Sequence, residues 1–191
     1  MWRFLKKPPL IGLDITFNEI RLLQLKKSGA HWHIEHCVCQ PLFSESSMSA
    51  QLAEIILQRK MMSYPVAIAV SDHQVLKKKI SFPSQLKEAD IAADIHQNHY
   101  QYLPECEREE MFVDFSILRI AHDTQDILLV ATQKQPLQSY IDTVKQAGLK
   151  LSIIDVDVYA LARAKAQHAD LLKSEPRFLL CYGLAMRDAV V

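Results

Sequence analysis

The sequence predicts an α/β protein, and two observations carry that prediction. Short apolar segments typical of strands alternate with segments whose apolar residues recur at helical spacing, from residue 10 to residue 182. The chain has 191 residues, of which 49% are hydrophobic, and this is enough to bury one ordinary core or two small ones. We therefore expect a folded chain without a repeat, a low-complexity tract or a long linker.

The first part of the chain predicts a β-meander. Residues 10–15, 19–25 and 31–39 have the pattern of three strands, and Gly29 stands in the connection between the last two, where a hairpin needs a positive φ. The next expected element is a helix over about 48–60. It would begin at one of the serines between 44 and 49 and have an apolar side that consists of Leu52, Ile55, Ile56 and Met62.

The rest of the chain predicts an insertion. The further expected elements are strands 65–70 and 75–82, a helix from Ser84 to Tyr100, strands 111–119 and 126–132, helix 136–147, strand 149–156, a helix from Asp157 to Leu172, and a last strand 178–182. Gly148 follows helix 136–147 where a glycine commonly ends a helix. This order places a small α/β unit at 83–148 inside a first unit made of 1–82 and 149–191.

Several segments, taken in order along the chain, resemble the type IV pilus assembly protein PilM family, whose members are cytoplasmic relatives of the actin-like protein FtsA. The segments are LIGLDITFNEIRLLQL (10–25), HWHIEHCVCQPL (31–42), VAIAVSDHQVLKKKISFP (66–83), QAGLKLSIIDVDVYALARA (146–164) and CYGLAMR (181–187). The resemblance implies the first lobe of an actin-like, ribonuclease-H-like fold, with an actin-like subdomain at 1–82 and 149–191 and a small inserted subdomain at 83–148. Only about a dozen residues separate Ala164 from Phe178, where the family has a second lobe, so that lobe is expected to be largely absent.

By the same resemblance, Asp14, Thr16 and Asn18 occupy the family's first phosphate loop and form a remnant cofactor-binding site. A carboxylate such as Asp14 suits Mg²⁺, which prefers oxygen ligands. The loop, however, contains the bulky Phe17 and no glycine, and actin-like folds hold their nucleotide between two lobes. We therefore expect no bound cofactor and ordinary turn residues here, with binding of ATP and Mg²⁺ as the alternative.

Composition excludes several classes of protein. The four glycines stand alone, so neither a dinucleotide-binding G-x-G-x-x-G nor a phosphate-binding G-x-x-x-x-G-K-[ST] loop is present. The 22 Lys and Arg residues balance 22 Asp and Glu residues, and a formal net charge of zero argues against a nucleic acid partner. A neutral chain also tends to associate, so a homo-oligomer is possible. Residues 1–9 lack the apolar core of a signal peptide, which predicts a cytoplasmic protein.

One cluster of potential metal ligands lies on the expected strand 31–39. Strict alternation would place His31, His33, Cys37 and Cys39 on one face of that strand. All four could not converge on one ion without a bend, and their spacing is not that of a zinc knuckle, so we expect no resident metal. No arrangement of catalytic residues was found, and Asp157 is expected at the N-terminus of a helix.

The resemblance implies a function as an adaptor. A protein of this family would bind the N-terminal cytoplasmic peptide of a PilN-like inner-membrane protein, in a groove beside the inserted subdomain, and would take part in type IV pilus assembly or DNA uptake without being an enzyme. Its membrane contact would be indirect, through other type IV pilus inner-membrane components, so it would be peripheral to the inner membrane. The alternative is an ATP-binding actin-like switch or ATPase that another chain completes.

Overall fold

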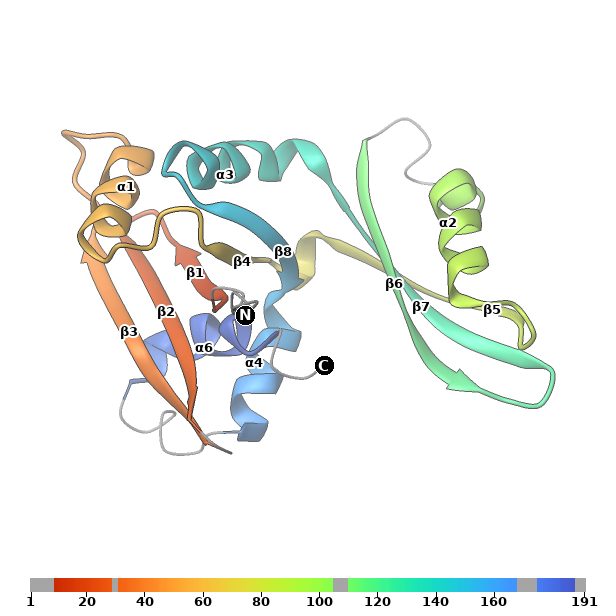
Figure 1. Cartoon of the computed structure of the whole chain (residues 1–191). Helices are drawn as coiled ribbons and strands as arrows, with labels where there is room; N and C mark the ends of the chain where they lie inside the picture. Colours follow the sequence, from red (N-terminus) through yellow and green to blue (C-terminus); the bar gives the residue numbers. More distant parts are fainter. Residues whose placement is uncertain (1–8, 29–30, 105–109, 168–174, 188–191) are drawn as a thin grey trace, which may run out of the picture. The chain divides into compact units, whose positions relative to one another are not determined.

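The structure, a computed structural model, describes residues 9–28, 31–104, 110–167 and 175–187. The chain divides into two compact units, Met1–Asp72 with Ser139–Val191, and His73–Gln138 (Figure 1). The second unit therefore begins about ten residues before the predicted boundary at 83 and ends about ten before the predicted 148. The reason at the first boundary is that the strand predicted at 75–82 pairs inside the second unit.

The first unit contains a five-stranded sheet in the order β3-β2-β1-β4-β8. Its strands are β1 (Ile11–Ile15), β2 (Glu19–Ser28), β3 (His31–Pro41), β4 (Pro65–Val70) and β8 (Lys150–Val156). The first three form the predicted antiparallel meander, and β4 lies parallel to both β1 and β8. Gly29, proposed for the hairpin connection, lies outside the described residues.

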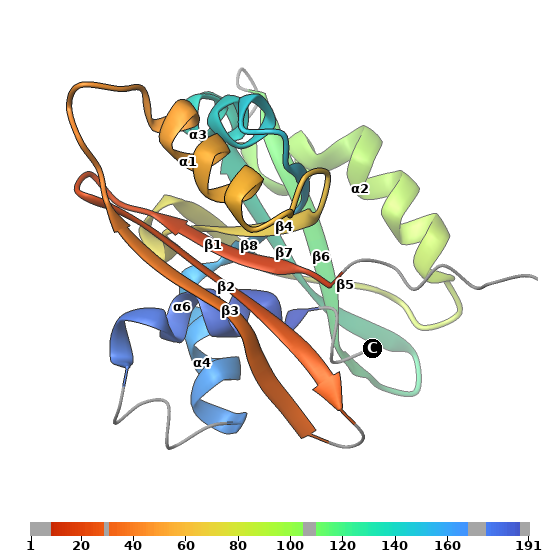
Figure 2. The same cartoon turned by 60° about the vertical axis from the view of Figure 1, so that its left-hand side comes forward.

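Helices cover both faces of this sheet (Figure 2). On one face, α1 (Met48–Gln58) and α3 (Lys134–Gln146) contribute Leu52, Ile56 and Val144 to a core with Ile11 and Leu22. The hydroxyl of Ser47 accepts a hydrogen bond from the Ala50 amide and confirms a serine cap for α1. Met62 was expected on the buried side of α1 but is 48% exposed, and its neighbour Met61, beyond the helix end, is buried instead.

On the opposite face lie α4 (Asp157–Gln167) and α6 (Leu179–Ala185), the latter preceded by the short 3₁₀ helix η3 (Pro176–Phe178). The predicted helix to residue 172 is thus confirmed as far as residue 167, and the rest of it lies outside the described residues. The predicted last strand 178–182 is wrong, because this segment is helical. Its residues are apolar on every side and almost all are buried, and an apolar run of that kind does not distinguish a buried strand from a buried helix.

Two glycines allow α6 to approach its neighbours closely. A Cβ on Gly12 of β1 would stand 1.8 Å from the carbonyl oxygen of Cys181, and a Cβ on Gly183 would stand 1.9 Å from that of Ala160 in α4. The helix α6 is therefore packed, backbone against backbone, between the sheet and α4.

The second unit is a three-stranded antiparallel sheet, in the order β5-β7-β6, with one helix on it. The strands are β5 (Val75–Pro83), β6 (Met111–Ile120) and β7 (Thr124–Gln133), and the helix is α2 (Glu88–Tyr102). Ile91 and Ile95 of α2 pack on Ile127 and Leu129 of β7, as the apolar side of the helix predicted. Ser84 does not cap α2, since its hydroxyl donates to the carbonyl of His122.

Candidate functional site

The turn between β1 and β2 brings together the three residues of the predicted phosphate loop. The Thr16 hydroxyl donates to Oδ1 of Asn18 at 2.7 Å, and it accepts a hydrogen bond from the Glu19 amide at 3.2 Å. The Thr16 amide donates in turn to the Glu19 carbonyl. Phe17, at the tip of the turn, is 93% exposed. The polar groups of the turn therefore bond to one another.

Asp14 has a partner of its own. Its carboxylate lies 2.8 Å from Nη2 of Arg21 on β2, and both side chains are 17% exposed. Burial raises the pKa of Asp14, because loss of hydration outweighs the opposing attraction of Arg21. The ion pair thus restrains Asp14 without fully compensating its carboxylate for the lost water.

The backbone at the end of β1 is also hydrogen-bonded to a side chain of the protein. The Ile15 amide donates to the hydroxyl of Tyr140 in α3 at 3.1 Å, and that hydroxyl reaches the Leu13 carbonyl at 3.5 Å. A phosphate needs free N–H and hydroxyl donors, and Mg²⁺ needs free carboxylate oxygens. In this conformation the Asp14 carboxylate, the Thr16 hydroxyl and the Ile15 amide are all engaged by the protein, so a nucleotide and its metal would have to displace these contacts.

The histidines and cysteines of β3 do not share one face. The register between β2 and β3 shifts between Gln24 and Leu25, so that His36 pairs with Gln24 while Ile34 pairs with Leu25. This bulge reverses the alternation, and it places Cys37 and Cys39 on the face of Leu23 while His33 lies on the other face. The prediction of one shared face is therefore wrong. The side chain of His31 lies outside the described part of the chain.

Sequence reasoning missed an ion pair at the end of β8. Asp155 is buried, and its Oδ2 accepts two hydrogen bonds from the guanidinium of Arg163 in α4, at 2.7 and 3.0 Å. Arg163 also donates to the Gly183 carbonyl at 2.8 Å, which ties β8, α4 and α6 together. The signal in the sequence was weak, because the partners lie eight residues apart across a strand–helix junction. Two residues on, Asp157 begins α4 as predicted and accepts a hydrogen bond from the Asp72 amide at 3.0 Å.

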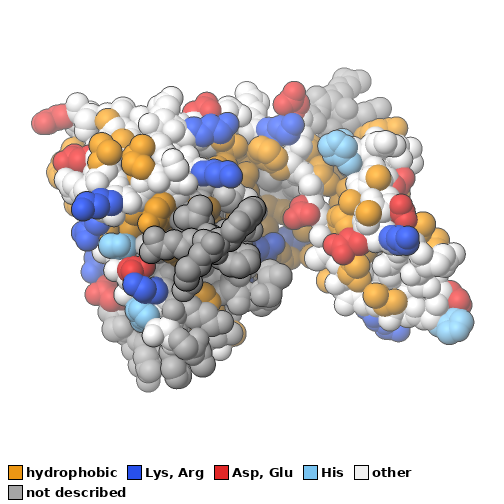
Figure 3. All heavy atoms as spheres, in the orientation of Figure 1, with side chains coloured by type: hydrophobic (Ala, Val, Ile, Leu, Met, Phe, Trp, Pro, Cys, Tyr) orange, Lys and Arg blue, Asp and Glu red, His pale blue; other side chains and the backbone are white. Residues whose placement is uncertain are grey.

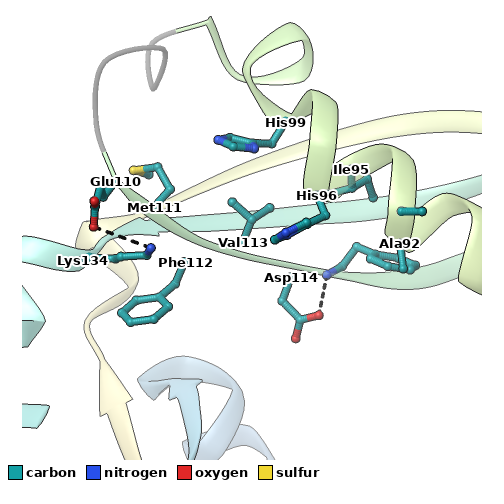
Figure 4. A pocket seen from close by; sticks show the side chains of 12 residues that line it. Ala92, Ile95, His96, His99, Glu110, Met111, Phe112, Val113, Asp114 and Lys134 are labelled. Carbon is teal, nitrogen blue, oxygen red and sulfur yellow. Dashed lines mark hydrogen bonds and ion pairs between the residues drawn. The ribbon is translucent and has the colours of Figure 1, made fainter.

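The second unit contains a hollow of about 900 Å³ between α2 and β6 (Figure 4). Its apolar lining includes Ile95 of α2 and Val113 and Phe115 of β6. Two histidines of α2, His96 and His99, also line it. No feature of the sequence marked this pocket, because it depends on how α2 lies over the sheet.

Comparison with known proteins places these features in a family. The family described as type IV pilus assembly protein PilM matches residues 12–177, which is most of the chain. This chain belongs to the PilM family. The predicted resemblance is therefore confirmed.

Solved structures of PilM and of a secretion protein resemble the fold. A chain of the PilM–PilN type IV pilus biogenesis complex matches with a TM-score of 0.64 and 16% sequence identity, over 83% of this chain and 50% of that one. The cytoplasmic domain of EpsL, an inner-membrane component of the type II secretion system of Vibrio cholerae, matches with a TM-score of 0.45 and 16% identity, over 79% of this chain and 58% of that one. The match to PilM confirms the predicted α/β, actin-like fold class. This chain spans half the length of the PilM chain that it matches.

In the part of the chain that the structure describes, no helix has the length and apolarity needed to cross a bilayer.

Proposed function

We propose that this PilM-family chain is a non-enzymatic adaptor of type IV pilus assembly or DNA uptake, which binds the N-terminal cytoplasmic peptide of a PilN-like inner-membrane protein. Two findings support the proposal. The family is that of a pilus assembly protein, and the PilM chain of similar fold was solved in a complex with PilN. An adaptor of this kind would lie at the cytoplasmic face of the inner membrane and reach the membrane through its partners.

The state of the β1–β2 turn favours an adaptor over an ATPase, and it is the observation that carries the proposal. Phosphoryl transfer depends on preorganised groups that hold the phosphates and their metal. Here the Asp14 carboxylate is paired with Arg21, and the hydroxyl of Thr16 is bonded to Asn18. Binding of a phosphate would have to break both interactions. Binding of a peptide elsewhere would leave them intact.

Two calorimetric titrations of the full chain test the proposal. The first uses a synthetic peptide with the sequence of the PilN-like protein's cytoplasmic N-terminus, with a peptide of scrambled sequence as the control. The second uses Mg²⁺-ATP, with the Asp14→Ala variant as its control. We expect saturable binding of the native peptide alone and no heat from Mg²⁺-ATP. Micromolar binding of Mg²⁺-ATP that is lost in Asp14→Ala would instead establish the ATP-dependent switch, and failure of the native peptide to bind would contradict the adaptor.

A further inference from the structure

The strand β6 has a free edge. It lies at one side of the sheet β5-β7-β6, and β7 is its one partner strand among the described residues. The Lys134 amide donates to the Glu110 carbonyl, which continues the ladder between β7 and β6 by one residue. Because alternate residues of an antiparallel strand bond to the same neighbour, even-numbered residues up to Ser116 face β7 and the odd-numbered residues face outward. In agreement, the Phe115 amide donates at 2.8 Å to the carboxylate of Asp114, not to β7 (Figure 4).

The far half of this edge strand carries three exposed apolar side chains. Ile117, Leu118 and Ile120 are 37%, 53% and 66% exposed, respectively. The register with β7 skips Leu118, because Ile117 pairs with Ile127 and Arg119 pairs with Asp126. Ile117 and Ile120 consequently point to the same face of the sheet as Val113 and Phe115, the face on which α2 packs.

Charged residues flank the centre of the strand on the other face. Asp114 pairs with Val130, and Arg119 with Asp126, so both side chains point away from α2. Their charges are opposite. Asp114 lies two residues before Ser116, and Arg119 lies two paired residues after it, because Leu118 forms a bulge and has no pairing partner in the register with β7. Two copies of β6 laid antiparallel about Ser116 would therefore bring Asp114 of each copy opposite Arg119 of the other.

We propose that a second copy of this chain is the partner of the β6 edge, and that the two strands pair antiparallel about Ser116 to form a continuous six-stranded sheet. In that register, Phe115 lies opposite the partner's Ile117, and Val113 lies opposite the partner's Ile120. The outward-facing amides and carbonyls of residues 115 and 117 bond to their counterparts in the other copy. In the single chain the Asp114 carboxylate accepts a hydrogen bond from the Phe115 amide. On pairing, the carboxylate gives up this bond and forms an ion pair with the partner's Arg119.

The same pairing gives the pocket an occupant. Val113 and Phe115 line the hollow between α2 and β6. Since the partner's Ile117 and Ile120 lie opposite these two residues, on the α2 side of the sheet, their side chains extend along the mouth of the hollow. Aliphatic side chains that are exposed in a single copy are thereby covered. The formal net charge of zero leaves no overall repulsion between copies.

A cysteine at the proposed two-fold axis tests the register. Ser116 faces β7, so across the new interface it forms a non-hydrogen-bonded pair, with Cα atoms about 4.5 Å apart, within the range that a disulfide spans. We expect Ser116→Cys to form a cross-linked dimer under mild oxidation. The matched control is Ser81→Cys, since Ser81 is likewise an exposed serine on the opposite edge strand, β5. Cross-linking of Ser116→Cys that does not exceed that of Ser81→Cys would overturn the proposed register.

Charge reversal tests the interface independently. Sedimentation equilibrium of the full chain, from low micromolar to several hundred micromolar, is expected to show a monomer–dimer equilibrium. Because each substitution alters two symmetric pairs, Asp114→Arg alone and Arg119→Asp alone should each weaken dimerisation about tenfold or more, while the double variant restores it. Circular dichroism checks that each variant is folded.

Three results would refute the pairing. The wild-type chain could stay monomeric at every concentration, the dimer could be indifferent to both single reversals, or the double variant could fail to recover dimerisation. If the wild-type chain stays monomeric and Ile120→Lys abolishes binding of the PilN-like peptide, the edge accepts that peptide and the proposal is wrong. The outcome is independent of the proposed function, since the adaptor can bind its peptide as a monomer or as a dimer.

Discussion

The substitution Gly183→Ala tests how closely α6 packs in the first unit. The added Cβ would stand 1.9 Å from the carbonyl oxygen of Ala160 and 2.5 Å from its carbonyl carbon. Even close carbon–oxygen contacts in proteins are about 3.3 Å or longer, so α6 and α4 must separate by roughly 1 Å or more. Both obstructing atoms belong to the backbone, and no change of rotamer can relieve the overlap.

The expected magnitude follows from two opposing effects. Overpacking of a core costs about 1–3 kcal/mol, and a backbone clash belongs at the upper end of that range. Replacing a glycine inside a helix by alanine stabilises the folded state by about 1 kcal/mol, because alanine has the higher helix propensity. The net loss is therefore about 2 kcal/mol. For a chain of this size each kcal/mol lowers the melting temperature by about 2–4 °C, so the variant should melt about 4–8 °C lower than the wild type.

Thermal unfolding followed by circular dichroism measures this difference. The control is Ala162→Gly, at an exposed position of α4, which reports the effect of helix propensity alone and should cost about 1 kcal/mol. The two effects have opposite signs at Gly183, so the direction of the change is decisive. A melting temperature for Gly183→Ala equal to or above that of the wild type would refute the close packing of α6 on α4.

Three further predictions concern buried polar groups. Arg163→Ala removes both guanidinium hydrogen bonds to Oδ2 of the buried Asp155, while Oδ1 keeps the Val156 amide at 2.9 Å and Arg187 at 3.6 Å. This variant should lower the free energy of unfolding by about 1–3 kcal/mol in urea titrations, with Arg163→Lys losing less, and an unchanged free energy of unfolding in Arg163→Ala would contradict this. Tyr140→Phe leaves the Ile15 amide without its acceptor and should cost about 1–3 kcal/mol in the same assay, whereas an unchanged midpoint would show that the hydroxyl contributes nothing. Because the folded protein raises the pKa of Asp14, it holds that proton more tightly than the unfolded chain does. Stability should therefore fall as pH rises from the ordinary value of 3.8 through the raised one, and Asp14→Asn should abolish this part of the pH dependence in urea titrations across that range.

Elements defined by local patterns were predictable from the sequence. The meander β1–β2–β3 follows from the apolar strand patterns, and Gly148 ends α3 with a φ of +82°, as a glycine after a helix should. What the sequence could not reveal depends on contacts between distant residues. The strand β5 has the expected limits, but its partner is β7, about fifty residues on, and periodicity says nothing about pairing.

The candidate site was only partly predictable for a similar reason. The resemblance to the family placed Asp14, Thr16 and Asn18 in one turn, and the structure brings them together there. The groups that occupy this turn come from elsewhere in the chain: Arg21 lies on the next strand and Tyr140 on a helix more than a hundred residues away. The prediction of which residues share a face of β3 was wrong because of a single β-bulge. The bulge has no signature in the sequence, and it reverses the alternation of every residue beyond it.

The way in which one unit interrupts the other has a consequence for the order of folding. The second unit is a single stretch of chain, His73–Gln138, and both of its strand pairings lie within that stretch. It can form its sheet as soon as that stretch has been synthesised. The first unit cannot, because β4 pairs with β8 some eighty residues later and β1 needs α6 from near residue 180 to cover it. The open edge of β4 and the uncovered face of β1 therefore wait longest for their partners during synthesis, and these surfaces are the ones most open to misassembly before the chain is finished.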